Sequence, residues 1–180
     1  MKSYDYAHRQ GVKPISWEEF ATLAAQLAEA LEQAGVEVIV GIARAGLLPA
    51  TVVACNLRRE LYPVRITRRV NDEVQYPSPV WKVPVSPEVA GKVVAVIDEI
   101  ADTGETLALV QNSVQACGAS GVITACLVRH SWANPVPTIS LLVTDELVIF
   151  PWDQQVLMEG RWQPHPEIVA ALAAQQTDSQ

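Results

Sequence analysis

The sequence has few of the features that mark disulfide-rich secreted proteins, zinc-binding proteins or membrane-spanning proteins. It has three cysteines in 180 residues, without metal-type spacing, which argues against a disulfide framework and a zinc site. No apolar run is long enough to cross a bilayer, and the first residues lack the apolar stretch of a secretory signal. We therefore expect a cytoplasmic protein without a membrane partner, and we expect its cysteines to be small buried residues.

Positive charge is also scarce. Thirteen Lys and Arg residues stand against twenty Asp and Glu residues, for a formal net charge of −7. Nonspecific nucleic-acid binding rests on basic residues that neutralise phosphates, so we expect no nucleic-acid partner. A small phosphorylated substrate is still compatible, because its site would be local. With 49% apolar and 18% charged residues, the chain predicts one domain over 1–180 with a substantial core.

Apolar runs alternate with segments of helical spacing along the chain. Strands are predicted at 36–42, 62–67, 93–97, 121–128, 139–143 and 147–150, and helices at 15–31, 50–59, 107–117 and 166–174. Ser16 and Glu19 predict a capping box at the start of the first helix. This alternation predicts an α/β fold, with a central, mostly parallel sheet flanked by helices. Ligands of such sheets bind at the carboxyl ends of the strands.

The segment 93–107 contains the strongest functional pattern. Its apolar, β-branched start predicts a strand buried on both faces, and the acids Asp98 and Glu99 follow it. A short loop, 101–104, then leads into a helical segment. This order predicts an anion site, because the amides of a first helical turn lack backbone partners and the helix dipole favours negative charge. Thr103 and Thr106 add hydroxyl groups, and Gly104 permits close approach of a ligand.

This segment resembles the phosphoribosyl-diphosphate (PRPP) signature of the type I phosphoribosyltransferases. That signature is an apolar strand, two acids, two small or apolar residues and then Asp-Thr-Gly-x-Thr. The resemblance implies that Asp98 and Glu99 hold the ribose hydroxyls and, mainly through PRPP, Mg²⁺. The loop would bind the 5′-phosphate through Ala101, Asp102, Thr103, Gly104, Glu105 and Thr106. The family usually has Asp second in the acid pair, whereas this chain has Glu99. The alternative, an ordinary loop with Asp102 as a helix cap, leaves the acid pair unexplained.

A second strand, loop and helix of the same design begins at residue 36. Its loop, 43–49, resembles the diphosphate loop of the xanthine-guanine branch of the family, with Ala45 in place of the usual first Gly. The resemblance implies that Ala43, Arg44 and Ala45 contact PRPP, and that Arg44 acts catalytically on the departing diphosphate. It also implies that the Ala43–Arg44 peptide is cis or strained. The alternative is that Arg44 is a solvated loop residue.

Residues 68–90 contain four prolines and six charges, and loops of this length are often functional lids. The family carries a flexible flap at the matching place, which closes over the reacting centre. The resemblance therefore implies a flap over about 68–90, in which Tyr76, Trp81 and Lys82 are the residues of interest. A β-arm, or packing against a neighbouring subunit, is the alternative for this segment.

The C-terminal part resembles the hood of the 6-oxopurine phosphoribosyltransferases, over about 129–165. The resemblance implies that Arg129 donates to the purine 6-oxo group, while Val148 and Asp153 read the 2-substituent. Leu147 stands where the family usually has an aromatic residue that stacks on the base. Asp153 is alternatively a turn residue, and its neighbour Trp152 a core residue. His130 and His165 belong to no constellation, so we expect them in surface or capping roles.

Together these resemblances imply a type I phosphoribosyltransferase fold with a small C-terminal hood. The activity that they imply is transfer of the phosphoribosyl group of PRPP to guanine, xanthine or hypoxanthine, which yields a nucleoside monophosphate and diphosphate. Asp102 is the implied general base, or the acceptor of the purine N7 proton. The family usually forms homodimers or larger homo-oligomers, and the same is expected here. Two alternatives stay open: an adenine or pyrimidine acceptor, and a non-catalytic PRPP-sensing regulator.

Overall fold

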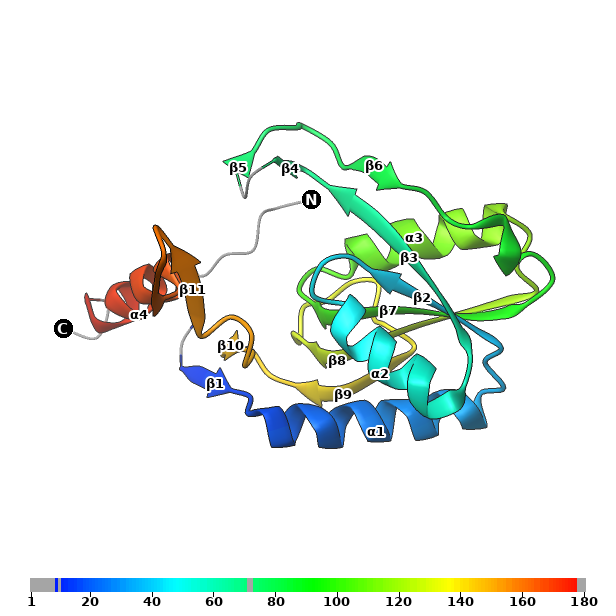
Figure 1. Ribbon diagram of the computed structural model, residues 1–180, viewed down its shortest axis with the longest axis horizontal. Coiled ribbons are helices and arrows are strands. Elements are labelled where there is room, and N and C mark those ends of the chain that lie inside the picture. Colours follow the sequence, from blue (N-terminus) through cyan, green and yellow to red (C-terminus); the bar gives the residue numbers. More distant parts are fainter. Residues whose placement is uncertain (1–8, 10, 71–72, 178–180) are drawn as a thin grey trace. The chain divides into compact units, whose positions relative to one another are not determined.

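The computed structural model describes residues 9, 11–70 and 73–177, and these form two compact units (Figure 1). The larger unit contains residues 23–143, and the smaller unit combines the chain before residue 23 with the chain from residue 144 onward. Helix α1 (Trp17–Gln33) belongs to both, because its first residues fall in the smaller unit.

The larger unit is built on a six-stranded sheet. Its strand order is β6-β3-β2-β7-β8-β9, and every neighbouring pair is parallel except β3 with the edge strand β6. The strands are β2 (Val38–Ile42), β3 (Glu60–Thr67), β6 (Val80–Val83), β7 (Val93–Ala101), β8 (Gly121–Arg129) and β9 (Ile139–Val143). This mostly parallel sheet confirms the predicted α/β fold.

Helices α2 (Leu47–Leu57) and α3 (Glu105–Ala116) cover opposite faces of this sheet (Figure 1). Side chains alternate along a strand, so Val40 and Val96 share one face with Val110 of α3. On the other face Gly41 lies against α2, where a Cβ atom would be 2.8 Å from the Ala50 Cβ. Among the helices that the structure describes, none combines the length and the apolar character that a membrane span requires.

Two elements near the predicted anion loops extend further than the sequence indicated. Strand β7 continues through both acids to Ala101, because β8 pairs with it along its whole length, up to Ala101 opposite Arg129. Helix α2 begins at Leu47 and includes Pro49 in its first turn. Proline is tolerated there because the missing N–H has no partner in a first turn anyway. The acids are therefore strand residues. The anion loop that begins at residue 43, called the first anion loop below because it comes first in the chain, is shorter than predicted.

The segment 68–90 contains paired strands. Strands β4 (Arg69–Val70) and β5 (Glu73–Val74) pair antiparallel, β6 joins the main sheet, and a short 3₁₀ turn η1 (Pro87–Val89) follows. The β-arm alternative is thus the one that these pairings favour. Residues 71 and 72 lie outside the described residues. Closure of this segment over a ligand stays a prediction.

The smaller unit combines both ends of the chain. Strand β1 (Val12–Pro14) pairs parallel with β10 (Leu147–Ile149), β11 (Gln155–Met158) and β12 (Arg161–Pro164) form a hairpin, and α4 (Pro166–Thr177) follows. Neither β1 nor the hairpin was predicted. Trp152 stacks on Phe150 with ring centroids 4.7 Å apart and meets the Phe20 ring edge-on at 5.3 Å. Trp152 therefore packs against other aromatic rings, as the core alternative for this residue predicted.

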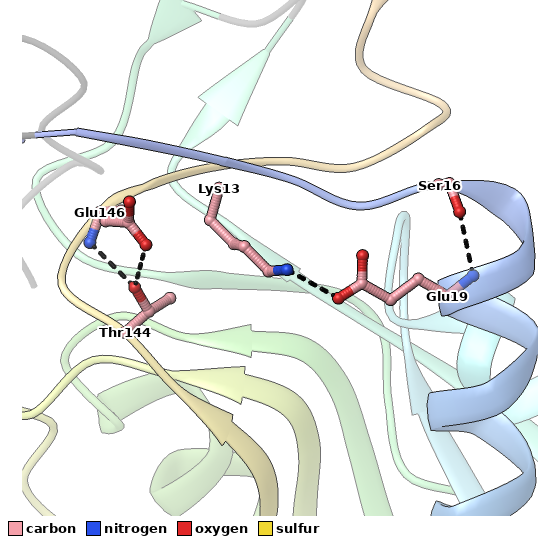
Figure 2. A network of polar contacts seen from close by, with 5 residues as sticks. All are labelled: Lys13, Ser16, Glu19, Thr144 and Glu146. Carbon is pink, nitrogen blue, oxygen red and sulfur yellow. Dashed lines mark hydrogen bonds and ion pairs between the residues drawn. The ribbon is translucent and has the colours of Figure 1, made fainter.

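Polar contacts of the smaller unit cap the start of α1 (Figure 2). The backbone N–H of Glu19 donates to Ser16 Oγ at 3.1 Å, which confirms that half of the predicted capping box. The Glu19 carboxylate forms an ion pair with Lys13 at 2.8 Å. In the same view the Thr144 hydroxyl donates to the Glu146 carboxylate at 3.0 Å.

The cysteines differ from the prediction. Only Cys126 is buried, on β8, whereas Cys55 and Cys117 are exposed near the ends of α2 and α3. All three are free thiols. The two exposed residues follow apolar helical segments, and their spacing alone did not distinguish the last, partly solvated turn from the buried stripe.

Candidate active site

The two predicted anion loops lie at the same edge of the main sheet. Strands β2 and β7 are parallel neighbours with Gly41 opposite Ile97, so their carboxyl ends lie side by side. Gly46, at the start of α2, touches Asp98 of β7, and a Cβ atom at Gly46 would lie 2.6 Å from Asp98 Oδ1. The larger unit therefore brings the two loops together at the carboxyl ends of its strands, where ligands of such sheets bind.

The first loop begins with a cis peptide bond between Ala43 and Arg44, as predicted. The Ala43 N–H donates to the Val64 carbonyl of β3 at 2.8 Å, which ties the loop to the neighbouring strand. The Arg44 carbonyl accepts from the Leu47 N–H at 3.1 Å and so joins the loop to α2. The Arg44 side chain is exposed at this edge, and Ala43 and Ala45 are half-buried.

The acid pair ends β7 at the same place. Asp98 is partly buried, and its Oδ1 accepts the backbone N–H of Glu99 at 3.0 Å. Burial, and then the nearby Glu99 carboxylate, raise the pKa of Asp98 well above its usual value. Two carboxylates held this close in a partly buried site favour a bound cation or hydroxyl donors.

Among the described residues no three metal-ligating side chains gather into a complete site. Oxygen donors from one or two carboxylates are nevertheless the usual protein contribution to Mg²⁺, which keeps waters and takes other ligands from a substrate phosphate. Asp98 and Glu99 fit that pattern.

The second anion loop, residues 102–104, joins β7 to α3. Gly104 is the residue before the helix, with a left-handed φ of 82°, and the Glu105 N–H donates to Thr103 Oγ1 at 3.4 Å. Asp102 stands two residues before Gly104, so the alternative reading of Asp102 as the helix cap is wrong. A Cβ atom at Gly104 would collide with the Pro135 carbonyl oxygen, so a side chain is excluded there.

The segment after β8 flanks this loop. The His130 N–H donates to the Ala101 carbonyl at 3.1 Å, and the Asn134 N–H donates to the Thr103 carbonyl at 2.8 Å. Between them, Trp132 Nε1 donates to Asp102 Oδ1 at 3.3 Å. His130 is fully buried and stacks on the Trp132 ring, so the expected surface role is wrong for His130.

Sequence reasoning missed Trp132 altogether. The available signal was its place just beyond Arg129, at the end of the strand after the signature helix.

Arg129 lies at the same edge, at the end of β8 and opposite Ala101 of β7. Its Nε donates to Ser140 Oγ of β9 at 3.1 Å, and its Nη1 donates to the His130 carbonyl at 3.4 Å. These contacts hold the half-buried guanidinium beside the carboxyl ends of β7 and β8.

The other predicted base contacts belong to the smaller unit. Leu147 and Val148 are buried on β10. The Leu147 N–H and the Ile149 carbonyl both bond to the β1 segment, so the intervening peptide groups of Val148 point away from β1. The Asp153 N–H donates to the Phe150 carbonyl at 3.0 Å, which places Asp153 in a turn.

Of the three predicted flap residues, two contact each other. Lys82 Nζ donates to the Tyr76 hydroxyl at 3.1 Å and lies 4.8 Å from the centroid of its ring. Trp81, opposite Ile66 of β3, packs against the core of the larger unit. Trp81 therefore anchors this segment to the sheet.

Comparison with known proteins relates most of the chain to one family. The model of the phosphoribosyl transferase domain matches residues 13–157. The chain is 30% identical over 152 residues to a xanthine-guanine phosphoribosyltransferase of Nitratidesulfovibrio vulgaris, with 81% of this chain and 86% of that protein covered. It is 29% identical over 113 residues to an adenine phosphoribosyltransferase of Corynebacterium efficiens, with 57% and 58% covered.

A solved structure shares the fold. The crystal structure of a purine phosphoribosyltransferase from Pyrococcus horikoshii superposes with a TM-score of 0.73 at 28% identity, and 84% of this chain and all of that chain are covered.

Proposed function

Since this chain belongs to the phosphoribosyltransferase family and is a transferase, we propose that it transfers the phosphoribosyl group of PRPP to a 6-oxopurine. The acceptor would be guanine, xanthine or hypoxanthine, and the products a nucleoside monophosphate and diphosphate. The observation that carries this proposal is the contact between Gly46 and Asp98, because it joins the two anion loops around one small site. Membership of a family of enzymes disfavours a purely regulatory role.

Each part of the site would act on one part of PRPP. The loop with Thr103 and Gly104 would hold the 5′-phosphate, and Asp98 and Glu99 the ribose hydroxyls. Breaking the bond from C1′ to diphosphate builds positive charge on the ribose, and Arg44 would stabilise the departing anion. Asp102, beside the phosphate loop, would accept the proton that the purine releases.

We propose Mg²⁺ as the cofactor, held mainly by PRPP and assisted by Asp98 and Glu99. The cation would neutralise charge on the diphosphate as it leaves. The raised pKa of Asp98 supports this assignment, because a nearby cation relieves the repulsion between the two carboxylates.

The acceptor assignment rests on Arg129. A 6-oxo group requires a hydrogen-bond donor, and Arg129 brings a guanidinium to the edge of the sheet where both anion loops begin. Val148, through its backbone, and Asp153, through its carboxylate, would read the purine 2-substituent, and Leu147 would occupy the place of the family's stacking residue. We further propose that 1–180 act as one catalytic domain, with a flap over 68–90 and a hood over 129–165. We also propose that the protein is cytoplasmic and assembles as a homodimer or larger.

A base panel tests the activity. The protein is incubated with PRPP and Mg²⁺ together with guanine, xanthine, hypoxanthine, adenine, uracil or orotate, and diphosphate release is followed. Release with 6-oxopurines alone supports the proposal. Release with adenine alone would favour the second candidate, which the similarity to an adenine phosphoribosyltransferase keeps open. No release with any base would overturn the proposed function. Reactions without base, and with EDTA, are the controls.

A further inference from the structure

A short backbone ladder continues the sheet beyond the ends of β7 and β8. The His130 N–H bonds to the Ala101 carbonyl at 3.1 Å, and the Asn134 N–H bonds to the Thr103 carbonyl at 2.8 Å. Residues 130–134 thus run beside residues 101–103. Trp132 lies at the middle of the first segment, and Asp102 at the middle of the second.

The Trp132 indole is oriented by its surroundings. Its ring stacks on His130 with centroids 4.6 Å apart and an interplanar angle of 18°. His130 is fully buried, so it presents a fixed surface on which the indole rests. From this position Trp132 Nε1 donates to Asp102 Oδ1 at 3.3 Å.

We propose that Trp132 is a positioning residue for Asp102. The indole N–H fixes the rotation of the Asp102 carboxylate and thereby aims the carboxylate at the proton that it accepts from the incoming base. This inference rests on the proposed function. A hydrogen bond to one carboxylate oxygen sets the plane of the group, and proton transfer depends on that direction.

The exposure of Trp132 argues against a role in core packing alone. Its side chain is 45% exposed, so it contributes little to the core. The two backbone bonds of the ladder are made without the indole and would persist in its absence. Loss of the N–H alone should therefore change the reaction and leave the loop in place.

The test compares Trp132→Phe with Trp17→Phe. The first keeps an aromatic ring on His130 but removes the N–H, and the second is a matched change at a 55% exposed tryptophan in the first turn of α1, outside the proposed hood and loops. We expect kcat of Trp132→Phe to fall about fivefold, the loss typical of one hydrogen bond, with KM for PRPP within about twofold of the starting value. Trp17→Phe should match the unaltered protein in both constants.

A double variant completes the test. If Trp132 acts through Asp102, then adding Trp132→Phe to Asp102→Asn should lower kcat no further. Three outcomes would overturn the inference. The first is an unchanged kcat in Trp132→Phe, and the second is a kcat in the double variant that falls by the product of the two single losses. The third is a loss of kcat together with a loss of PRPP affinity in calorimetry, which would indicate a structural role. Failure of the proposed function is distinguishable, because the unaltered protein would then turn over none of the bases.

Discussion

Gly46 of the first anion loop and Asp98 of the acid pair are in direct contact across the ends of β2 and β7. A Cβ atom at Gly46 would lie 2.6 Å from Asp98 Oδ1 and 2.7 Å from the Ile42 carbonyl oxygen. The φ of Gly46 is −61°, so its backbone suits any residue, and only space excludes a side chain. These two segments are about fifty residues apart along the chain, and they can approach this closely only because Gly46 has no side chain.

Gly46→Ala should therefore separate the two loops. We expect a destabilisation of about 1–3 kcal/mol and a loss of PRPP affinity larger than that stability change alone explains. Urea unfolding and calorimetric titration with PRPP measure the two effects. The matched control is Gly121→Ala at the start of β8, where a Cβ atom would meet only the Val93 methyl groups, at an ordinary 3.8 Å. Equal PRPP affinities in the two variants would contradict the argument.

Asp102→Asn tests the proposed proton acceptor. The amide keeps the size of the carboxylate but not its basicity, so kcat should fall about a hundredfold or more while PRPP affinity changes little. Steady-state kinetics and calorimetry separate the two quantities. Because Asp102 is not the cap of α3, the thermal midpoint should change little. Equal losses of turnover and of PRPP affinity would mean that Asp102 serves the structure of the loop.

Arg129→Ala tests the acceptor assignment. Removal of the guanidinium takes away the proposed donor to the 6-oxo group, so KM for the purine should rise at least about tenfold with little change in KM for PRPP. Arg59→Ala, at an exposed position just beyond α2, removes the same charge outside the proposed hood and serves as control. Unchanged purine KM in Arg129→Ala would remove the main support for a 6-oxopurine.

Asp98 makes the stability of the metal-free protein depend on pH. Burial and the Glu99 carboxylate raise the pKa of Asp98, so the folded protein binds this proton more tightly than the unfolded chain does. The stabilisation is present at low pH and is lost as the pH rises from about 4, the pKa of an unfolded Asp, through the raised pKa of the folded state. The free energy lost is about 1.4 kcal/mol for each unit by which folding raises the pKa of Asp98.

Asp98→Asn lacks this titration. Its free energy of unfolding, measured in EDTA without PRPP, should therefore decline less than that of the unaltered protein as the pH rises, and should exceed it above the raised pKa. Urea unfolding between pH 5 and 8 gives both curves. Curves that run parallel over this range would refute the effect.

Thiol reactivity should differ among the cysteines. Burial, and then the Asp98 carboxylate, raise the pKa of Cys126 to about 12, whereas Cys55 and Cys117 are exposed. At pH 8 the folded protein should alkylate at the two exposed residues and not at Cys126, because the thiolate is the nucleophile. Peptide mass spectrometry after brief iodoacetamide treatment measures this, and the urea-unfolded protein is the control. Rapid labelling of Cys126 in the folded state would contradict the burial.

Local signals were sufficient for the five parallel strands of the main sheet and for the start of α1, but not for the edge strand β6. Ile139–Val143 is a strand with the predicted bounds, and Ser16 caps α1 as expected. A strand buried in a parallel sheet is an apolar run whatever its neighbours are, and a cap is a contact between residues three apart. Such features do not depend on the rest of the chain.

Pairings between distant segments were not predictable in the same way. Strand β1 is three residues long and pairs with β10, more than 130 residues away along the chain. The β11–β12 hairpin carries exposed side chains without a buried alternation, so no period-2 pattern marked it. The contact of Trp132 with Asp102 likewise depends on the ladder between residues 130–134 and 101–103.

The sequence by itself determined the parallel strands of the main sheet, the four α-helices and the chemistry of the two loops, because these follow from residue type and local spacing. Only the tertiary structure decided which strands are neighbours, that Asp98 is partly buried against Gly46, and that an indole donates to Asp102. Those facts depend on how a parallel sheet places the ends of non-consecutive strands side by side, and local spacing does not encode that placement.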